Sequence, residues 1–162
     1  MEPNMNRLGR SSLAVAPKAI APEKKTSRNP MILIAEDDDD GRNMMQTLLR
    51  LKGYAVIGAA NGLQAVELAL TKLPDLILLD LELPMLDGLA VTRNLRHHPK
   101  FRQVPIVVIS GHDPAKHRDA ALSAGCTDYL LKPVDFEHLE KILTASVPLS
   151  DGDSTLSRAT RA

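Results

Sequence analysis

Short apolar runs alternate with longer segments of helical periodicity through the middle of the chain. A run of four or five apolar residues without polar alternation is typical of a strand buried on both faces of a parallel sheet. The segments between these runs repeat their apolar residues every three or four positions, as an amphipathic helix does. This pattern predicts five strand–helix units, with strands at residues 31–35, 55–59, 76–80, 106–110 and 129–131.

Capping residues and helix breakers set the boundaries of the segments between the strands. Asp39 or Asp40 is predicted to cap a first helix that runs to about Lys52. A second helix follows Asn61-Gly62, ends at Pro74-Asp75 and carries on one face Leu63, Val66, Leu70 and Leu73. The other helices are predicted at about residues 89–97, at 114–124 behind an Asp113 cap and before Gly125, and at 136–146.

Alternating strands and helices predict an α/β fold, a doubly wound five-stranded parallel sheet with right-handed crossovers. In such folds ligands bind at the carboxyl ends of the strands. The chain places Glu36 and Asp37 after the first strand, Asp80 at the end of the third, Ser110 at the end of the fourth and Lys132 after the fifth. We therefore expect three carboxylates, a hydroxyl and an ammonium at one edge of the sheet.

Three carboxylates gathered at one place repel one another unless a cation lies among them. Glu36, Asp37 and Asp80 therefore predict a site for a hard divalent cation. Mg²⁺ is favoured over Ca²⁺ and Zn²⁺, because the carboxylates are few, no Cys or His cluster is near, and water and a phosphate oxygen could complete the ligand set. Each carboxylate alone would be explained as an exposed acidic run or a turn residue, so the prediction depends on their combination.

Composition excludes several classes of protein. The 162 residues are 44% hydrophobic and 25% charged, which excludes a collagen-like, mucin-like or wholly disordered chain. The single cysteine, Cys126, can form no intramolecular disulfide and is expected to be a small buried thiol in a reducing compartment. No apolar run approaches the roughly 18 residues of a membrane span. We therefore expect a cytoplasmic protein with no membrane contact.

Charge and proline content divide the chain into three parts. Residues 1–30 hold six basic and two acidic residues, four prolines and no sustained apolar period, which predicts a disordered basic leader. Residues 31–147 hold twelve basic and sixteen acidic residues, contain all predicted strands and helices, and form one domain. Residues 148–162 are predicted to be a disordered tail. The leader's charge of +4 is spread too thinly to favour a nucleic-acid contact over a solvated segment.

Four segments at the predicted strand ends resemble the landmarks of the response-regulator receiver domain (CheY-like) of two-component signalling. They are MILIAEDD at residues 31–38, LLDLELPMLDG at 78–88, VISG at 108–111 and YLLKP at 129–133. Their order and spacing over residues 31–147 are those of the family. The resemblance implies a flavodoxin-like sheet with strand order 2-1-3-4-5, and a cis peptide bond between Lys132 and Pro133.

The resemblance also implies which residues would hold the metal and accept the phosphoryl group. Asp80 would be the phosphoacceptor. Mg²⁺ would be held by the side chains of Asp80 and Asp37 and by the backbone carbonyl of Glu82, with Glu36 acting through water.

Further roles follow from the same resemblance. Ser110 and Lys132 would bind the phosphoryl oxygens, and Tyr129 stands where the family has its switch aromatic, which turns inward as the hydroxyl residue closes on the phosphate. Glu82 and His112 lie two places after the acceptor and the hydroxyl residue, and would tune the lifetime of the phosphate by orienting or blocking water.

The implied function is phosphoryl transfer to Asp80 from a phosphohistidine of a sensor histidine kinase or a histidine phosphotransfer protein. The chain would be a phosphoacceptor signalling protein, with no enzyme activity beyond its own phosphorylation and slow dephosphorylation. One alternative is a haloacid-dehalogenase-type phosphatase, which also uses an Asp nucleophile with Mg²⁺ but has a second Asp where Glu82 stands. The other is a degenerate receiver acting only as a scaffold, against which Asp37, Asp80 and Lys132 count.

The output is expected to be protein contact. Only 16 residues follow Ser146, too few for a DNA-binding or other output domain, so we expect a stand-alone receiver. Its downstream partner would bind the face formed by helix 114–124, strand 129–131 and helix 136–146. A homodimer that forms on phosphorylation stays open as an alternative.

Overall fold

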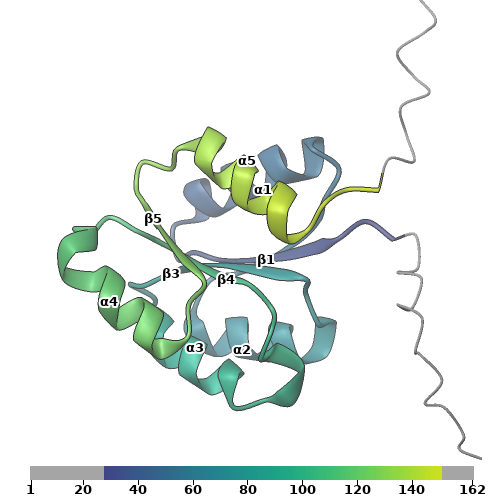
Figure 1. Ribbon diagram of the computed structural model, residues 1–162. Helices are drawn as coiled ribbons and strands as arrows, with labels where there is room; N and C mark the ends of the chain where they lie inside the picture. Colours follow the sequence, from purple (N-terminus) through teal and green to yellow (C-terminus); the bar gives the residue numbers. More distant parts are fainter. Residues whose placement is uncertain (1–27, 151–162) are drawn as a thin grey trace, which may run out of the picture.

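Five parallel strands form one sheet in the computed structural model, which describes residues 28–150 (Figure 1). The strand order is β2-β1-β3-β4-β5, as the resemblance implies. The elements are β1 (Met31–Ala35), α1 (Asp39–Leu51), β2 (Ala55–Ala59), α2 (Gly62–Lys72), β3 (Leu76–Asp80), α3 (Gly88–Arg96), the 3-10 helix η1 (Pro99–Phe101), β4 (Ile106–Ser110), α4 (Pro114–Ala124), β5 (Asp128–Leu131) and α5 (Phe136–Ser146). The predicted fold class and the five strands are confirmed. The predicted leader lies outside the described residues except for 28–30, and the predicted tail except for 148–150.

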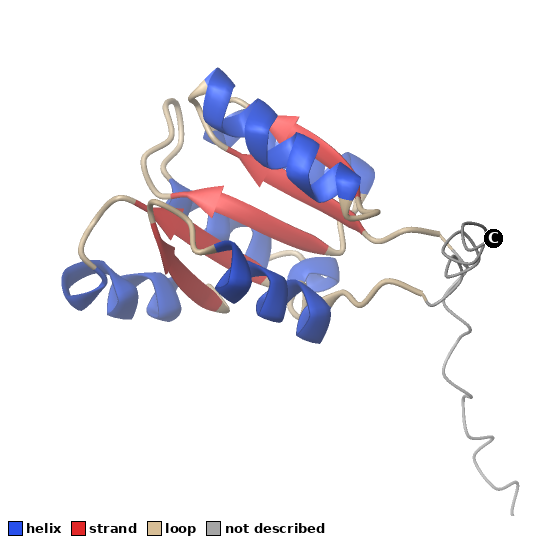
Figure 2. Cartoon of the chain, turned by 90° about the horizontal axis from the view of Figure 1, so that it is seen from above, coloured by secondary structure: helices blue, strands red, loops and turns tan. Residues whose placement is uncertain are grey.

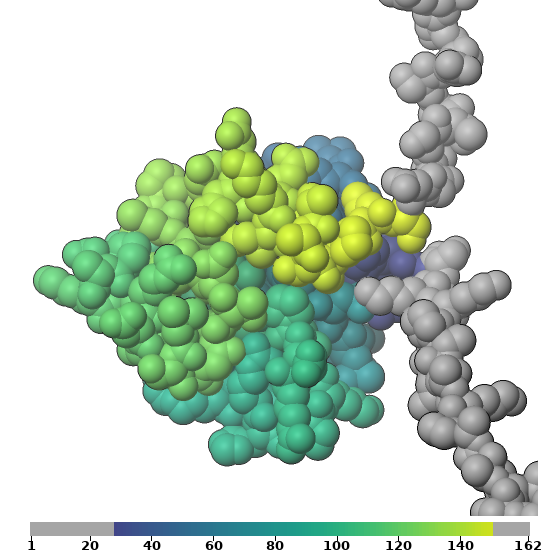
Figure 3. Space-filling view, in the orientation of Figure 1, coloured from purple at the N-terminus to yellow at the C-terminus, as the bar shows by residue number. Residues whose placement is uncertain are grey.

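Helices cover both faces of the sheet, as Figure 1 shows, with α1 and α5 on one face and α2, α3 and α4 on the other. Alternate residues of each strand face opposite ways, so β1 sends Leu33 into one core cluster and Ile32 and Ile34 into the other. Strands buried on both faces must be apolar throughout, which explains their uninterrupted apolar runs. Seen from above, the strands lie side by side and point the same way (Figure 2). On the face seen in Figure 3, α4 in green and α5 in yellow both lie at the surface.

Every α-helix within residues 28–150 begins with a short polar side chain that caps its first turn. The caps are Asp38, Asn61, Asp87, Asp113 and Asp135, and each accepts a hydrogen bond from a backbone N–H two or three residues later. The prediction of Asp113 is confirmed. The prediction of Asp39 or Asp40 for α1 is wrong: both are helical residues of the first turn, and Asp38 is the residue with the extended backbone that a cap requires.

The buried face of α2 differs from the predicted one. Leu63, Leu70 and Leu73 are 51%, 39% and 40% exposed, whereas Ala65 and Ala69 are fully buried. The fully buried positions of the helix are small residues, which allow it to lie close to its neighbours. At Gly62, a Cβ atom would lie 1.8 Å from the carbonyl oxygen of Leu86. Close packing has therefore buried the alanines and left Leu63 and Leu70 exposed, while Val66, as predicted, and Leu68 pack against the core and are partly buried.

Smaller differences concern element ends. Helix α3 begins one residue earlier than predicted, behind the Asp87 cap, and ends at Arg96, while β5 begins at Asp128. The 3-10 helix η1 was not predicted, and its Phe101 is buried with 1% exposed.

None of the helices in residues 28–150 combines the length and the apolar character that crossing a membrane requires.

Candidate functional site

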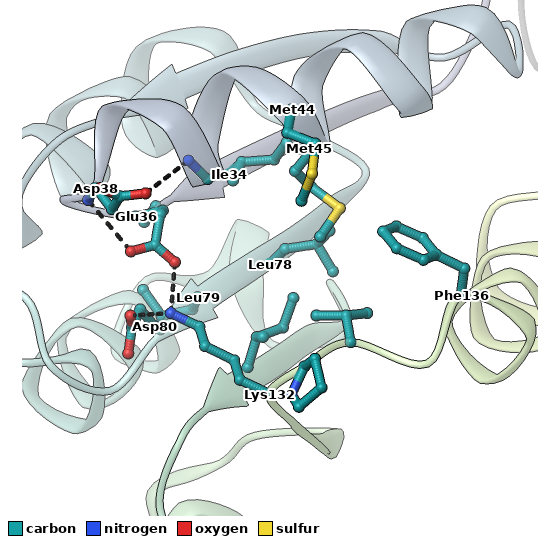
Figure 4. A pocket seen from close by; sticks show the side chains of 15 residues that line it. Ile34, Glu36, Asp38, Met44, Met45, Leu78, Leu79, Asp80, Lys132 and Phe136 are labelled. Atoms are coloured by element: carbon teal, nitrogen blue, oxygen red, sulfur yellow. Dashed lines mark hydrogen bonds and ion pairs between the residues drawn. The ribbon is translucent and has the colours of Figure 1, made fainter.

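Three carboxylates and one ammonium meet at the carboxyl edge of the sheet, as the sequence predicts. Figure 4 shows the contacts of Lys132 with Glu36 and Asp80. Oxygen atoms of Glu36, Asp37 and Asp80 all lie within 4.8 Å of one another. The Nζ atom of Lys132 lies 2.6 Å from Oε2 of Glu36 and 2.6 Å from Oδ2 of Asp80. Asp80 is buried, Glu36 is half-buried and Asp37 is exposed. The cluster is therefore open to solvent on the Asp37 side and closed on the Asp80 side.

Burial and the ion pairs have opposite effects on the pKa values of Glu36 and Lys132 in this cluster. Burial raises the pKa of Glu36 above its ordinary value, and the hydrogen bond from Lys132 opposes that rise without cancelling it. Burial alone would lower the pKa of Lys132, but its hydrogen bonds to Asp80 and Glu36 outweigh this and raise the pKa above its ordinary value. Lys132 thus stays charged and neutralises only one of three carboxylates.

The donor set fits a hard divalent cation. All three side chains offer oxygen atoms, which are the ligands that Mg²⁺ prefers, and the ammonium leaves two negative charges uncompensated. No other group of three His, Cys, Asp or Glu side chains with this spacing occurs among the described residues. The acidic cluster is thus the candidate metal site of residues 28–150.

Backbone contacts hold the acidic residues in place. The N–H of Glu82 donates to Oδ1 of Asp80 over 2.9 Å. Gly88 begins α3 so close to the end of β3 that a Cβ there would lie 2.3 Å from the carbonyl oxygen of Asp80. The guanidinium of Arg42, whose side chain is 15% exposed, donates to the carbonyl oxygen of Glu36 over 2.7 Å. Arg42 was not among the predicted site residues, because a basic residue two positions after an acidic run carries no signal of where its side chain points.

A second group of predicted residues is joined by hydrogen bonds beside the acidic cluster. Ser110 is fully buried at the end of β4, one position beyond the residue that pairs with Asp80. The N–H of His112 donates to Oγ of Ser110 over 3.1 Å, and the Tyr129 hydroxyl donates to the carbonyl oxygen of His112 over 3.0 Å. The Nε2 atom of His112 lies 2.6 Å from Oε1 of Glu82. All eight predicted site residues therefore lie in two connected groups at one edge of the sheet.

Lys132 connects the two groups through its backbone as well as its side chain. Its N–H donates to the carbonyl oxygen of Ser110 over 2.8 Å. The peptide bond to Pro133 is cis, as the resemblance implies. Cys126 is a buried free thiol, as predicted, and lies 3.4 Å from the Thr92 hydroxyl.

An apolar cavity of about 310 Å³ continues from the acidic cluster between α1 and the segment that leads into α5 (Figure 4). Its apolar lining includes Ile34, Met45 and Leu78, which belong to the core, while Met44 and Phe136 are 54% and 39% exposed. The cavity was not predicted, because its walls come from segments that are far apart in the sequence, such as α1 and the segment before α5.

The chain is similar to known receiver domains and response regulators, in a family model, in curated relatives and in solved structures. Residues 32–144 match the family model of the response regulator receiver domain. The receiver domain of sensor histidine kinase PA1611 from Pseudomonas aeruginosa PAO1 is 36% identical, with a TM-score of 0.68 over 74% of this chain and 98% of that one. That structure has a magnesium ion coordinated in its active site cleft.

Two curated relatives differ in how much of their length is matched. The transcriptional regulatory protein PrrA of Mycobacterium tuberculosis is 38% identical over 105 residues, which are 65% of this chain and 44% of PrrA. The polar-differentiation response regulator DivK of Brucella anthropi is 32% identical over 103 residues, 64% of this chain and 84% of DivK. The chain thus spans less than half of PrrA and most of DivK.

Proposed function

The chain belongs to the response regulator receiver domain family of two-component signalling, and on that premise we propose that Asp80 is its phosphoacceptor. The phosphoryl group would come from a phosphohistidine on a sensor histidine kinase or a histidine phosphotransfer protein. The observation that carries the proposal is the position of Asp80, whose buried carboxylate ends β3 within 2.6 Å of the Lys132 ammonium and beside two further carboxylates.

The transfer is a displacement at phosphorus. A carboxylate oxygen of Asp80 forms a bond to phosphorus as the bond from phosphorus to the imidazole nitrogen breaks, and the imidazole leaves with the electron pair and takes a proton from water. Such reactions need in-line placement and charge neutralisation more than further covalent chemistry. Lys132 would supply positive charge beside the entering phosphoryl group, and the Ser110 hydroxyl would donate to one of its oxygens.

Mg²⁺ is the proposed cofactor, and when bound it supplies the remaining positive charge that phosphoryl transfer requires. Asp37, Asp80 and the backbone carbonyl of Glu82 would hold it, with Glu36 acting through water. The two uncompensated negative charges of the cluster and its all-oxygen donor set support this assignment.

Phosphorylation would change protein contacts. Tyr129, whose hydroxyl reaches the loop after Ser110, would transmit the change, and a downstream protein would bind the face formed by α4, β5 and α5. Glu82 and His112, whose exposed side chains contact each other beside the cluster, would tune the phosphate lifetime. We further propose that residues 31–147 form the receiver domain, flanked by segments that take no part in phosphoryl transfer.

Phosphorylation by a small acyl phosphate tests the acceptor. Incubation with Mg²⁺ and acetyl phosphate should add one phosphate to the parent protein, and Asp80→Asn should take up none, because the amide cannot form the acyl phosphate. Intact mass measures the product. The matched control is Asp40→Asn, an exposed first-turn residue of α1 outside the cluster, which should be phosphorylated like the parent. Phosphate on Asp80→Asn would contradict the proposal.

The same experiment distinguishes the alternative functions. Continuous phosphate release at high turnover from unrelated phosphomonoesters would indicate a phosphatase. An unmodified parent protein would indicate a scaffold.

Removal of a metal ligand tests the Mg²⁺ assignment. Asp37→Ala should weaken Mg²⁺ binding at least tenfold, because it removes the exposed carboxylate of the cluster. Asp40→Ala, which removes a nearby carboxylate outside the cluster, should leave the affinity near that of the parent. Calorimetric titration with Mg²⁺ measures both, and thermal stability should rise with Mg²⁺ in the parent by mass action. Equal affinities in Asp37→Ala and the parent would show that the metal assignment is wrong.

A further inference from the structure

The loop between β4 and α4 is held at one residue, His112, from three directions. Its N–H donates to Oγ of Ser110, and its carbonyl oxygen accepts the hydroxyl of Tyr129. Its side chain leaves the loop and reaches Glu82, with Nε2 donating to the carboxylate Oε1 over 2.6 Å. Glu82 belongs to a different loop, the one between β3 and α3. A single residue thus connects the hydroxyl residue, the tyrosine and the acceptor loop.

The acceptor loop has a matching arrangement. Glu82 donates its own N–H to Oδ1 of Asp80 over 2.9 Å, as His112 donates its N–H to Ser110. Both bonds join a residue to the side chain two places before it, one on each side of the site. The Glu82–His112 contact closes the chain of bonds, which runs from Asp80 through Glu82 and His112 to Tyr129.

The residues joined by this series of hydrogen bonds differ in how far they are exposed. Tyr129 is 4% exposed and Ser110 is fully buried, whereas the side chains of Glu82 and His112 are 73% and 42% exposed. The ring of His112 also lies 4.8 Å, centroid to centroid, from the ring of His117 in α4. The contact between the side chains of Glu82 and His112 is therefore the weakest of these hydrogen bonds. It is also the one that can open without disturbing the core.

We propose that the side-chain bridge between Glu82 and His112 is a latch that couples the acceptor loop to Tyr129. When closed, it fixes the β4–α4 loop where the His112 carbonyl oxygen receives the Tyr129 hydroxyl and keeps that side chain buried. When open, the carbonyl is free to move and the buried position of Tyr129 loses support. Glu82 and His112 are positioning residues in this role, which is separate from any effect on water; its meaning for signalling rests on the function proposed above.

The bridge between Glu82 and His112 is exposed to solvent, so it can stabilise the buried position of Tyr129 only weakly. Exposed pairs of this kind change an equilibrium by at most about fivefold. Opening the latch should therefore shift the ratio of buried to exposed Tyr129 severalfold and leave the fold intact.

The full chain offers a direct probe, because it contains two tyrosines, Tyr54 and Tyr129, and no tryptophan. We would incorporate 3-fluorotyrosine, assign the two ¹⁹F signals with Tyr54→Phe, and record spectra without a phosphodonor. Glu82→Ala and His112→Ala should each move the Tyr129 signal towards the position of an exposed tyrosine. Tyr54 lies beyond the end of α1 and is the internal control, so its signal should not move.

Further variants separate the latch from a general effect of mutation. The double variant Glu82→Ala/His112→Ala should move the Tyr129 signal no further than either single variant, because both remove one interaction. His112→Gln, which keeps a side-chain N–H donor, should bring the signal back towards the parent position. Lys116→Ala, an exposed change in α4, should leave it unchanged.

Each outcome supports or overturns the latch. Equal, non-additive shifts with recovery in His112→Gln support it. An unchanged Tyr129 signal in Glu82→Ala overturns it, and so does a shift in His112→Ala alone, which would mean that the ring acts through His117. Because these spectra need no phosphodonor, a failure of Asp80 phosphorylation would leave this test intact.

Discussion

Lys132 compensates only part of the charge around it. Its ammonium contacts Asp80 and Glu36, and the exposed Asp37 completes an acidic cluster with two excess negative charges. Glu36 is the carboxylate that this arrangement destabilises, because it is partly buried and lies beside Asp80. Both effects raise the pKa of Glu36.

The raised pKa of Glu36 predicts a pH-dependent stability. Because the folded-state pKa of Glu36 lies above its ordinary value of 4.5, the stability it contributes is fully present below the unfolded pKa and is lost as pH rises through the folded pKa. Glu36→Gln cannot ionise, so in a chelating buffer at pH 7 it should be more stable than the parent. Solvent screening limits the gain to less than about 1 kcal/mol. Thermal unfolding at pH 7 and pH 4 measures it, and the gain should shrink at pH 4.

The control is Glu67→Gln, an exposed residue of α2, which should change stability at neither pH. If Glu36→Gln were less stable than the parent at pH 7, the pairing with Lys132 would outweigh burial.

At the scale of elements, α2 shows how closely the helices approach the sheet. Ala69 is fully buried and Leu70, its neighbour, is 39% exposed. Ala69→Leu should therefore lower the free energy of unfolding by about 1 to 3 kcal/mol, because the added carbons have no space. Leu70→Ala should cost less than about 1 kcal/mol. Urea denaturation measures both, and the opposite order would mean that the leucines face the core.

At the scale of the whole molecule, the described residues contain the five-stranded sheet and two core clusters. Arg28 and Met31 are tied to Asp75, by contacts of 3.1 Å and 2.7 Å, at the start of β1. A chain shortened to residues 28–150 should therefore unfold with the same free energy as the full chain and bind Mg²⁺ with the same affinity. Denaturation and calorimetry measure these quantities. A loss of more than about 1 kcal/mol would place part of the stable domain outside these residues.

The sequence by itself determined the fold class, because strands buried on both faces leave uninterrupted apolar runs that separate cleanly from helical periodicity. It also determined which residues stand at the carboxyl edge, since a residue such as Asp80 that ends a parallel strand lies at that edge whichever face its side chain takes. The cap of α1 was predicted one or two residues too late, at Asp39 or Asp40, because these residues and Asp38 differ in backbone conformation and not in side chain.

Only the tertiary structure decided the packing and the contacts between loops. The buried face of α2 depends on how closely Gly62 approaches Leu86, a distance that periodicity does not contain. Three further features depend on the direction in which side chains point: the Arg42 contact, the cavity beside Lys132 and the Glu82–His112 bridge. Sequence pattern assigns a residue to an element and a face, whereas these contacts depend on rotamers and on the distance between elements, which are set by the packing of the whole core.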